Sequence, residues 1–314
     1  MTIMYAGVLG GSQNPNFATT LYTGNGGTQS IVTGKNNSAG SLTWIKRRDV
    51  VSDHWLIDVT RGASQYLRSN TTSEQTPTLG AFSFTSNGFN LGNSDSNVNA
   101  NASNYVAWTF LEAAGFFDVV SYTGNNSSGA QSISHNLTVK PECLIVKNLS
   151  ANSDWRVFHT NLAADGVLKL NTSGAAVSVF PPIFSPSNNN SSQFYVAFDN
   201  NITGNNYIAY LFAHNPSKKI ACDVFTTDGA GEATVTCGFR PQWVLFKSST
   251  VTGGTNDWYI LDTARGWGAG NDNDLRANLA NAEGTSVNYG EPTSSGFTID
   301  SLSSSTSFVY IAIG

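Results

Sequence analysis

Charged side chains are scarce in this 314-residue sequence. Asp, Glu, Lys and Arg make up 12% of the chain, against about 25% in an ordinary globular protein. The formal net charge at pH 7 is -5, so no strong positive field would attract a phosphate backbone, and the composition argues against a nucleic-acid partner. Asn, Ser, Thr and Gly take the place of the missing charges, which predicts a polar but uncharged surface.

Long apolar segments are also missing. No apolar run approaches the length needed to span a membrane, and the N-terminal MTIMYAGVLGGSQNPN lacks a basic start followed by a long apolar core. We therefore expect no membrane insertion and no secretion signal, with synthesis in a cytoplasm. The helix formers Glu, Lys and Arg are rare, while β-branched and aromatic residues abound, so we expect an almost entirely β protein.

Only three cysteines are present, too few for a disulfide framework. Cys222 and Cys237 lie symmetrically about the turn at 228–231, so a hairpin centred there would place them opposite each other on two strands. A cross-strand disulfide is geometrically allowed there. A reduced apolar pair is favoured, because no secretion signal is seen, and the sequence leaves both states open. Cys143 precedes Leu-Ile-Val and is expected in the core.

The dominant positive feature is a threefold repeat with a period of about 100 residues. Each repeat has an aromatic-Thr pair before a Gly/Asn turn, then an aspartate near a tryptophan, then a closing aromatic strand. This period is too long for a solenoid and matches one small β domain. The patterns that align are Tyr22-Thr23, Tyr122-Thr123 and Phe225-Thr226, followed by Trp55, Trp155 and Trp258.

The repeat predicts three tandem β-sandwich domains, jelly-roll-like and of about 100 residues each. Their predicted ranges are 17–115, 116–217 and 218–314, called repeats 1, 2 and 3 below, after an N-terminal arm at 1–16. The joints at 111–115 and 214–219 are short, which predicts a semi-rigid rod of three beads.

Local patterns predict individual hairpins. Apolar stretches around Trp44 and Leu56 flank a charged turn, and the same arrangement recurs at 144–158 and 243–261. A second turn signal lies at 85–89, with strands expected on both sides, and a closing strand is expected at 105–110.

Candidate catalytic residues are few. Asp58 and Asp262 recur in an Asp-x-x-Arg-Gly pattern, which favours an ion pair or a turn brace over a catalytic carboxylate. The four histidines occupy unrelated repeat positions, and no zinc-ligand spacing, nucleophile elbow or phosphate loop is found. We therefore predict no catalytic residue, no cofactor and no metal ligand. The recurring Lys46, Lys147 and Lys247 are expected to snorkel or to pair locally.

Repeat 3 carries an insertion at 267–274 that is a possible ligand loop. Asp272 and Asp274 could hold calcium, but the spacing lacks the closing glutamate of a known calcium loop, and a solvated turn is favoured. Trp267 and Tyr289 are the aromatic residues that would stack on a sugar ring if they were exposed. Burial is the commoner state for tryptophan.

The N-terminal arm contains apolar side chains that a merely frayed terminus would not need. A frayed end is the commoner case for such a segment, and an attachment arm that orders on a partner is the alternative. The residues that would make this contact are Ile3, Met4, Tyr5, Val8 and Leu9.

Several strings resemble a known family. They are LYTGNGGTQSI, LTWIKRRD, HWLIDVTRG and YLRSNTTSE in repeat 1, FDVVSYTGN and LIVKN in repeat 2, and PQWVLFK and WYILDTARG in repeat 3. Together they resemble a repeated domain of virion structural proteins from tailed bacteriophages, cyanophages especially. The resemblance covers the chain after the arm, and its motifs are structural, with no catalytic residues to carry over.

The resemblance implies a non-enzymatic virion protein, made in the host cytoplasm and displayed as a tail fibre or knob or as a head decoration. Its partners would be other capsid or tail proteins, with a homotrimer as one option. A lectin-like adhesin that binds host surface glycans is the first alternative. A polysaccharide-degrading tailspike is the second, and it would need two acids in one groove.

Overall fold

The computed structural model describes residues 14–92, 95–125, 130–251 and 256–314. These residues form strands in antiparallel sheets, with five short 3-10 helices and no α-helix among the described ranges, so the expected all-β class is confirmed. A helix able to cross a membrane is likewise not found in the part of the chain that is described. The 3-10 helices are η1 (Asn37–Ala39), η2 (Pro186–Asn188), η3 (Phe198–Asn200), η4 (Pro216–Lys218) and η5 (Thr263–Arg265).

Each repeat forms a principal sheet, and the strand order is the same in all three repeats. The order is β1-β9-β3-β4 in repeat 1, and repeats 2 and 3 match it with β10-β17-β12-β13 and β18-β25-β20-β21, each extended by two strands. The first and last strands of every repeat pair with each other, and the register is equivalent: Phe17 lies opposite Phe110, Phe117 opposite Phe212 and Ile220 opposite Ile313.

The principal strands have the following bounds. In repeat 1 they are β1 (Phe17–Thr23), β3 (Ser41–Arg47), β4 (Trp55–Asp58) and β9 (Asn104–Leu111). In repeat 2 they are β10 (Phe117–Thr123), β12 (Cys143–Asn148), β13 (Arg156–His159), β14 (Gly166–Lys169), β15 (Val177–Ser178) and β17 (Asn206–Phe212). In repeat 3 they are β18 (Ile220–Thr226), β20 (Trp243–Ser248), β21 (Tyr259–Asp262), β22 (Asp272–Arg276), β23 (Gly284–Val287) and β25 (Ser307–Ile313).

A smaller sheet accompanies each principal sheet, and stacked aromatic rings join the two. The Tyr22 and Tyr105 rings stack at 5.0 Å, and Phe89 of the smaller sheet meets Tyr22 edge-on at 6.1 Å. Repeats 2 and 3 reproduce this trio with Tyr122, Tyr207 and Phe194, and with Phe225, Phe308 and Phe297. The remaining strands are β2 (Gln29–Val32), β5 (Gln65–Tyr66), β6 (Thr76–Pro77), β7 (Phe82–Thr85), β8 (Gly88–Leu91), β11 (Gln131–Ser134), β16 (Gln193–Val196), β19 (Ala233–Thr236) and β24 (Gly296–Ile299).

The predicted hairpins are confirmed. β3 pairs with β4, β12 with β13, β20 with β21 and β7 with β8, all antiparallel. The alignment of tryptophans was wrong by one residue in repeat 1. Because Leu42 pairs with Asp58 as Trp243 pairs with Asp262, the position of Trp258 and Trp155 corresponds to His54, not to Trp55.

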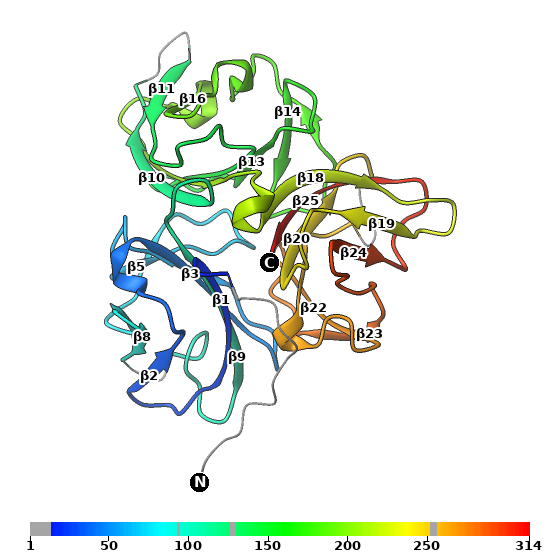
Figure 1. The fold of residues 1–314 in the computed structure, drawn as a ribbon. Helices are drawn as coiled ribbons and strands as arrows, with labels where there is room; N and C mark the ends of the chain where they lie inside the picture. The colour runs from blue at the N-terminus through cyan, green and yellow to red at the C-terminus, as the bar shows by residue number, and fades with distance from the viewer. Residues whose placement is uncertain (1–13, 93–94, 126–129, 252–255) are drawn as a thin grey trace.

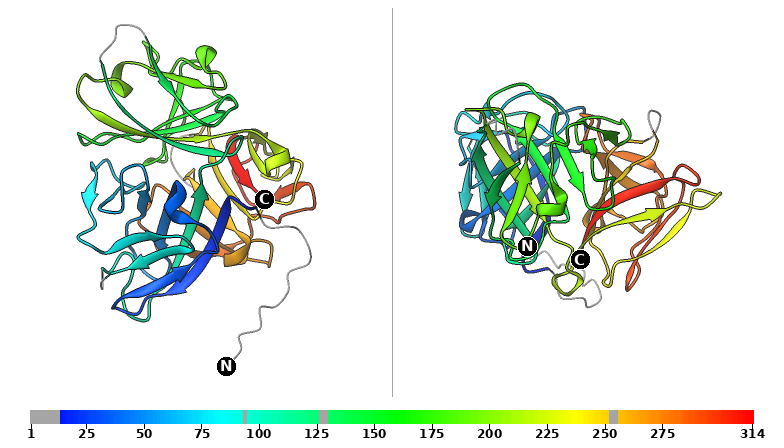
Figure 2. Two further views of the ribbon diagram at one scale, coloured as in Figure 1. Left: turned by 60° about the vertical axis from the view of Figure 1, so that its left-hand side comes forward. Right: turned by 90° about the horizontal axis from the view of Figure 1, so that it is seen from above.

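The three repeats surround a common centre (Figures 1 and 2). One apolar cluster contains residues from all three, and across it Phe17 lies 5.8 Å from Trp243 and Phe110 lies 6.0 Å from Phe212. The predicted rod of three beads is therefore wrong, since repeats 1 and 3 also touch. We call the structure a ring, and the contacts between its repeats seam 1–2, seam 2–3 and seam 3–1.

The principal strands close the ring because both of their faces are apolar. Along β25, alternate residues Val309, Ile311 and Ile313 join the central cluster. Phe308, Tyr310 and Ala312 join a second cluster inside repeat 3. Since successive strand residues point to opposite faces, one strand contributes to two cores. A continuous apolar run of this kind is typical of strands buried on both sides.

The end of the predicted arm belongs to the ring. Asn14 is fully buried, and its Nδ2 donates to the carbonyl oxygens of Lys218 and Lys219 at 3.2 and 3.4 Å. Lys35 Nζ donates to the Asn14 carbonyl at 2.8 Å. The five apolar arm residues from Ile3 to Leu9 lie outside the described residues, so the attachment role stays a prediction.

Candidate functional site

Each repeat contains a clamp of one Asp, one Asn and one basic residue. In repeat 3, Asn278 Nδ2 donates to Asp257 Oδ1 at 2.6 Å, while Arg276 pairs with Asp257 Oδ2 at 3.1 Å. The Asn278 side-chain oxygen accepts the backbone N–H of Trp258 at 2.8 Å. The same clamp is formed by Asp53, Asn70, Arg68 and His54 in repeat 1, and by Asp154, Asn171, Lys169 and Trp155 in repeat 2.

The clamps also join the repeats. Trp155 Nε1 donates to the Arg68 carbonyl across seam 1–2, and Trp258 Nε1 donates to the Lys169 carbonyl across seam 2–3, both at 2.9 Å. At seam 3–1 the His54 ring takes this role, with Nε2 3.1 Å from the Arg276 carbonyl.

The hydrogen bonds fix the tautomer of His54. Trp44 Nε1 donates to His54 Nδ1 at 2.9 Å, so Nε2 carries the proton and donates across the seam. Burial holds the pKa of His54 well below its ordinary value, which keeps the ring neutral. The histidine is therefore part of the seam, with both nitrogens in use.

Asp58 and Asp262 are structural braces, as the sequence favoured. Asp262 is fully buried, accepts the Arg265 backbone N–H at 2.9 Å and pairs with Arg265 Nε at 2.6 Å. Trp108 Nε1 from repeat 1 donates to the same carboxylate at 2.9 Å, and Tyr210 Oη from repeat 2 donates to Asp58 at 2.9 Å. Both carboxylates thus hold a turn and a seam together.

Repeat 2 has lost this brace on both sides of its seam. The strand register places His159 where repeats 1 and 3 have Asp58 and Asp262. Ile311 of repeat 3 stands where Trp108 and Tyr210 supply donors elsewhere. Acceptor and donor are therefore absent together. His159 Nε2 lies 3.3 Å from the Tyr310 carbonyl, and burial lowers the pKa of His159 to about 4.

The recurring lysines do not snorkel. Lys46, Lys147 and Lys247 are fully buried. Lys147 Nζ donates to the Thr72 carbonyl across seam 1–2 at 2.9 Å, and Lys247 Nζ donates to the Ser173 carbonyl across seam 2–3 at 3.0 Å. Burial lowers the pKa of each lysine to about 8. They are strand-end donors to backbone carbonyls rather than surface groups.

The predicted hairpin that would place Cys222 opposite Cys237 is wrong. Cys222 lies in β18, which pairs with β25, whereas Cys237 follows β19, which pairs with β24 in a different sheet. All three cysteines are free and buried, and burial raises the pKa of the Cys237 thiol to about 11. The strands on either side of the turn at 228–231, β18 and β19, belong to different sheets. They therefore do not pair with each other, although the sequence is symmetric about the turn.

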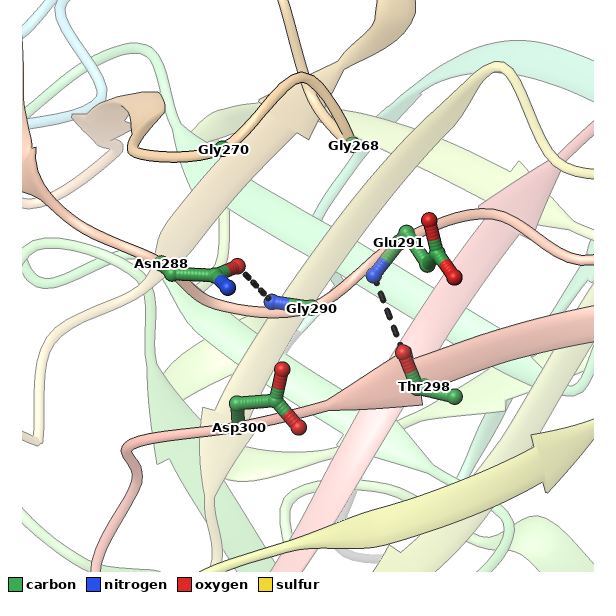
Figure 3. Close-up of a pocket in the computed structure, with 7 residues that line it drawn as sticks. All are labelled: Gly268, Gly270, Asn288, Gly290, Glu291, Thr298 and Asp300. Carbon is green, nitrogen blue, oxygen red and sulfur yellow. Dashed lines mark hydrogen bonds between the residues drawn. The ribbon is translucent and has the colours of Figure 1, made fainter.

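The ligand loop predicted in repeat 3 borders a polar pocket of about 280 Å³ (Figure 3). Asn288 Oδ1 accepts the Gly290 N–H at 2.9 Å, and the Glu291 N–H donates to Thr298 Oγ1 at 3.0 Å. Gly290 adopts φ 104°, a conformation that favours glycine, and a Cβ there would collide with the Thr298 carbonyl. The lining residues are Gly268, Gly270, Asn288, Gly290, Glu291, Thr298 and Asp300.

The ligand-loop residues predicted from the sequence lie near this pocket but do not line it. Asp272, fully buried on β22, accepts the Gly268 N–H at 2.9 Å and the Tyr289 N–H at 2.7 Å, so it ties together two pocket segments. Trp267 and Tyr289 are each 4% exposed. The alternative of a sugar-stacking platform is therefore wrong, and the burial favoured for Trp267 is confirmed, because both rings pack in the apolar core of repeat 3.

The solvated turn preferred over the insertion 267–274 is confirmed for residues 268–271, which are exposed, and is wrong for Asp272 and Asp274. Asp272 and Asp274 lie on β22, and both are buried. Asp274 Oδ2 pairs with Arg276 Nε at 3.1 Å, and burial raises the pKa of both aspartates. Within the described residues no cluster of three or more His, Cys, Asp or Glu side chains forms a metal site.

Sequence reasoning missed the residues that actually line the pocket. Asn288, Glu291, Thr298 and Asp300 come from one loop and from the edge of β24, and none of them recurs in a motif. Gly290 beside Glu291 was an available signal, since a glycine can mark a close backbone approach.

The family model for a domain of unknown function (DUF7483) matches residues 13–314. A search of curated proteins finds no match. The matched range begins next to the buried Asn14 and includes all three repeats and all three seams, so the whole ring corresponds to one family unit. The chain belongs to the DUF7483 family.

Proposed function

We propose that this protein is a non-enzymatic structural component of a tailed-phage particle, displayed on the virion surface as a tail fibre or knob or as a head decoration. The observation that carries this proposal is the use made of the recurring ionisable groups. The Asp58 and Asp262 braces, the three clamps, Lys147 and Lys247 hold turns and seams together. This structural use of repeated charged residues is what we expect of a protein that serves as a scaffold.

The sequence resemblance to virion domains and the surface chemistry also support the proposal. With 12% charged residues, the surface suits display in water. Weak contacts that are repeated over many displayed copies gain avidity without strong individual sites. We further propose that each repeat is a β-sandwich of jelly-roll type, that the partners are capsid or tail proteins, and that the arm residues Ile3 to Leu9 make the attachment.

Two alternatives have a specific observation in their favour. A glycan-binding adhesin would use the polar pocket of Figure 3, through hydrogen bonds rather than ring stacking, because Trp267 and Tyr289 are buried. A polysaccharide-degrading tailspike would need two carboxyl groups in one groove, and Glu291 and Asp300 line the same pocket. A Glu291→Gln, Asp300→Asn double variant separates the two, since only hydrolysis requires the carboxyl groups as acid and nucleophile or base.

The first experiment is cryo-EM of purified particles, comparing the natural protein with a variant that lacks residues 1–13. The deletion stops before Asn14, which is buried in the ring. Density lost from the capsid would identify a head decoration held by its arm, and density lost from the tail would identify a fibre or knob. A thermal melt of the purified variant is the control, because an intact ring should melt like the full chain. If the full-length protein is never found on particles, the proposal fails.

A further inference from the structure

The three seams place equivalent residues in equivalent positions, so each seam serves as a reference for the others. At seam 3–1, Arg265 is held by Asp262, and its Nη1 donates to Glu283 Oε1 at 3.0 Å and to the Asn273 carbonyl at 2.9 Å. Arg48 of repeat 1 pairs with the same Glu283 at 2.8 Å. Every polar group of this charged cluster is satisfied by the protein.

Seam 1–2 keeps the inner half of this cluster and lacks the outer half. Asp58 accepts from Arg61 Nε at 2.6 Å, and Arg61 Nη2 donates to the Leu56 carbonyl at 2.9 Å, as in repeat 3. Gln75, which precedes Thr76 in the β5–β6 pair, takes the place of Glu283, which precedes Gly284 in the β22–β23 pair. Leu149, two residues after Lys147, takes the place of Arg48, two residues after Lys46.

The missing outer pair leaves a buried donor unpaired. The Arg61 side chain is 3% exposed, and within the described chain its Nη1 is buried without a hydrogen-bond partner. A buried, unpaired donor is costly, and native proteins seldom tolerate one on a charged group. The equivalent atom of Arg265 donates to a carboxylate oxygen and to a backbone carbonyl, so a carboxylate is an acceptor that fits this position.

Arg61 also lines a pocket of about 350 Å³ in seam 1–2, a volume within the range of small-ligand sites. Its chemistry is mixed. Thr123 Oγ1 donates to Asn206 Oδ1 at 2.9 Å, which leaves the amide nitrogen of Asn206 and the lone pairs of Thr123 for a ligand. Its lining includes Arg61 and Gln75 from repeat 1 and Ser121, Thr123, Leu149 and Asn206 from repeat 2.

We propose that the seam 1–2 pocket binds a hexuronic acid unit, a sugar that carries a carboxylate. The sugar carboxylate takes the place that Glu283 fills in repeat 3 and accepts from Arg61 Nη1. The sugar hydroxyl groups bond to Ser121, Thr123 and Asn206, and the apolar C–H face of the ring rests on Leu149. This inference goes beyond the display role and does not depend on where the protein is mounted.

Calorimetric titration of the full chain with glucuronate, glucose and acetate tests the proposal. Glucuronate should bind in the millimolar range, and glucose and acetate should each bind about tenfold more weakly or worse, because each offers only part of the contact. If glucose binds as well as glucuronate, the carboxylate contact with Arg61 is wrong. If acetate binds as tightly as glucuronate, the proposed contacts with the sugar ring and its hydroxyl groups are wrong. Absence of glucuronate binding overturns the proposal.

The variant Gln75→Glu provides an independent readout. It supplies the carboxylate that repeat 3 carries at Glu283, so it should raise the melting temperature and remove glucuronate binding. Gln242→Glu, which makes the same change of charge away from both pockets, is the matched control and should change neither property. Unchanged glucuronate binding by Gln75→Glu would place any bound sugar elsewhere and refute the assignment.

Discussion

Seam 3–1 and seam 2–3 pack equivalent strands together with different side chains, charged in seam 3–1 and uncharged in seam 2–3 at the same positions. Seam 3–1 buries Asp262 and Arg265. It leaves the Glu283 side chain 9% exposed and satisfies all three charged groups by named partners. Seam 2–3 has His159 and Leu162 at the positions of Asp262 and Arg265, with Ile311 facing them. Both bury one strand face against the centre. The difference teaches that this position of a seam needs complementary side chains and does not need an ion pair, as expected when a buried ion pair and a neutral pair of similar size are close in stability.

The largest expected effect comes from breaking the charged seam. Asp262→Ala leaves the Arg265 guanidinium buried without its first carboxylate, and it removes the acceptor of Trp108 Nε1. We expect a loss of about 3–5 kcal/mol in the free energy of unfolding, measured by urea titration. The control is Asp199→Ala, which breaks the exposed Arg156–Asp199 pair and should cost at most about 1 kcal/mol. Equal losses would contradict the structural role of Asp262.

The second prediction converts seam 1–2 into a copy of seam 2–3. The triple variant Asp58→His, Arg61→Leu, Tyr210→Ile installs the neutral set His159, Leu162 and Ile311 at the equivalent positions. Asp58→Ala alone should lower the free energy of unfolding by about 3 kcal/mol or more. The triple variant should recover most of this loss, because removing both charges leaves no unpaired buried charge. Urea titration of both variants decides. A triple variant no more stable than Asp58→Ala would show that the seams are not interchangeable.

The third prediction concerns the donors that link the repeats. Trp258→Phe removes the indole N–H that reaches the Lys169 carbonyl and should cost about 1–3 kcal/mol beyond the change of volume. Trp55→Phe is the matched control, since Trp55 is equally buried but its Nε1 has no hydrogen-bond partner among the described residues. Thermal melts compare the two. An equal or greater loss in Trp55→Phe would contradict the role of the Trp258 N–H as a link between repeats 2 and 3.

The fourth prediction is acid sensitivity of seam 2–3. Burial lowers the pKa of His159 from 6.5 to about 4, so the neutral ring is favoured in the fold. Between these values the unfolded chain binds more protons. The stability that depends on neutral His159 is therefore complete above pH 6.5 and is lost as the pH falls toward 4. The difference in unfolding midpoint between the natural protein and His159→Gln should narrow or reverse in this window, and a constant difference would refute the burial of His159.

The smallest expected effect has the opposite sign, at the joint of repeats 1 and 2. Burial, with the charges of Asp118 and Asp58, raises the pKa of Glu112 from 4.5 to about 7. Between these values the folded chain binds more protons, so stability falls as the pH rises from 4.5 to 7. Glu112→Gln should raise the melting temperature at pH 8 and leave it nearly unchanged at pH 4.5. A gain that does not vary with pH would point to packing instead.

Much of the fold could be predicted because hairpins are local. The turn between β3 and β4 and the pairing of β7 with β8 follow from patterns within a few residues. Ring closure could not be predicted in this way, because it depends on the second face of strands such as β25. Val309 and Ile311 pack against other repeats, yet they look the same in sequence as Phe308 and Tyr310, which pack inside repeat 3. Alternation cannot separate two apolar faces.

The site was harder to predict for a similar reason. The recurrence of Asp58 and Asp262 correctly suggested a brace, because the same spacing to an Arg within one turn, repeated in the chain, is a local signal. The two pockets come from residues without recurrence, and Arg61 becomes distinctive only when its environment is compared with that of Arg265. Trp267 and Tyr289 could have stacked on a sugar only if they were exposed, and their rings lie in the core, which is the commoner state for tryptophan.

Closure also changes how the molecule would respond to mechanical load. A row of three units has two contacts, and breaking either one leaves two units joined only by their linker, while its two outward faces need polar capping. In the ring, Trp155, Trp258 and His54 each link a different pair of repeats. One contact can open under shear while every unit stays connected to the others through the remaining two. A closed arrangement of three is therefore redundant against a single failure, which a row of the same three units is not.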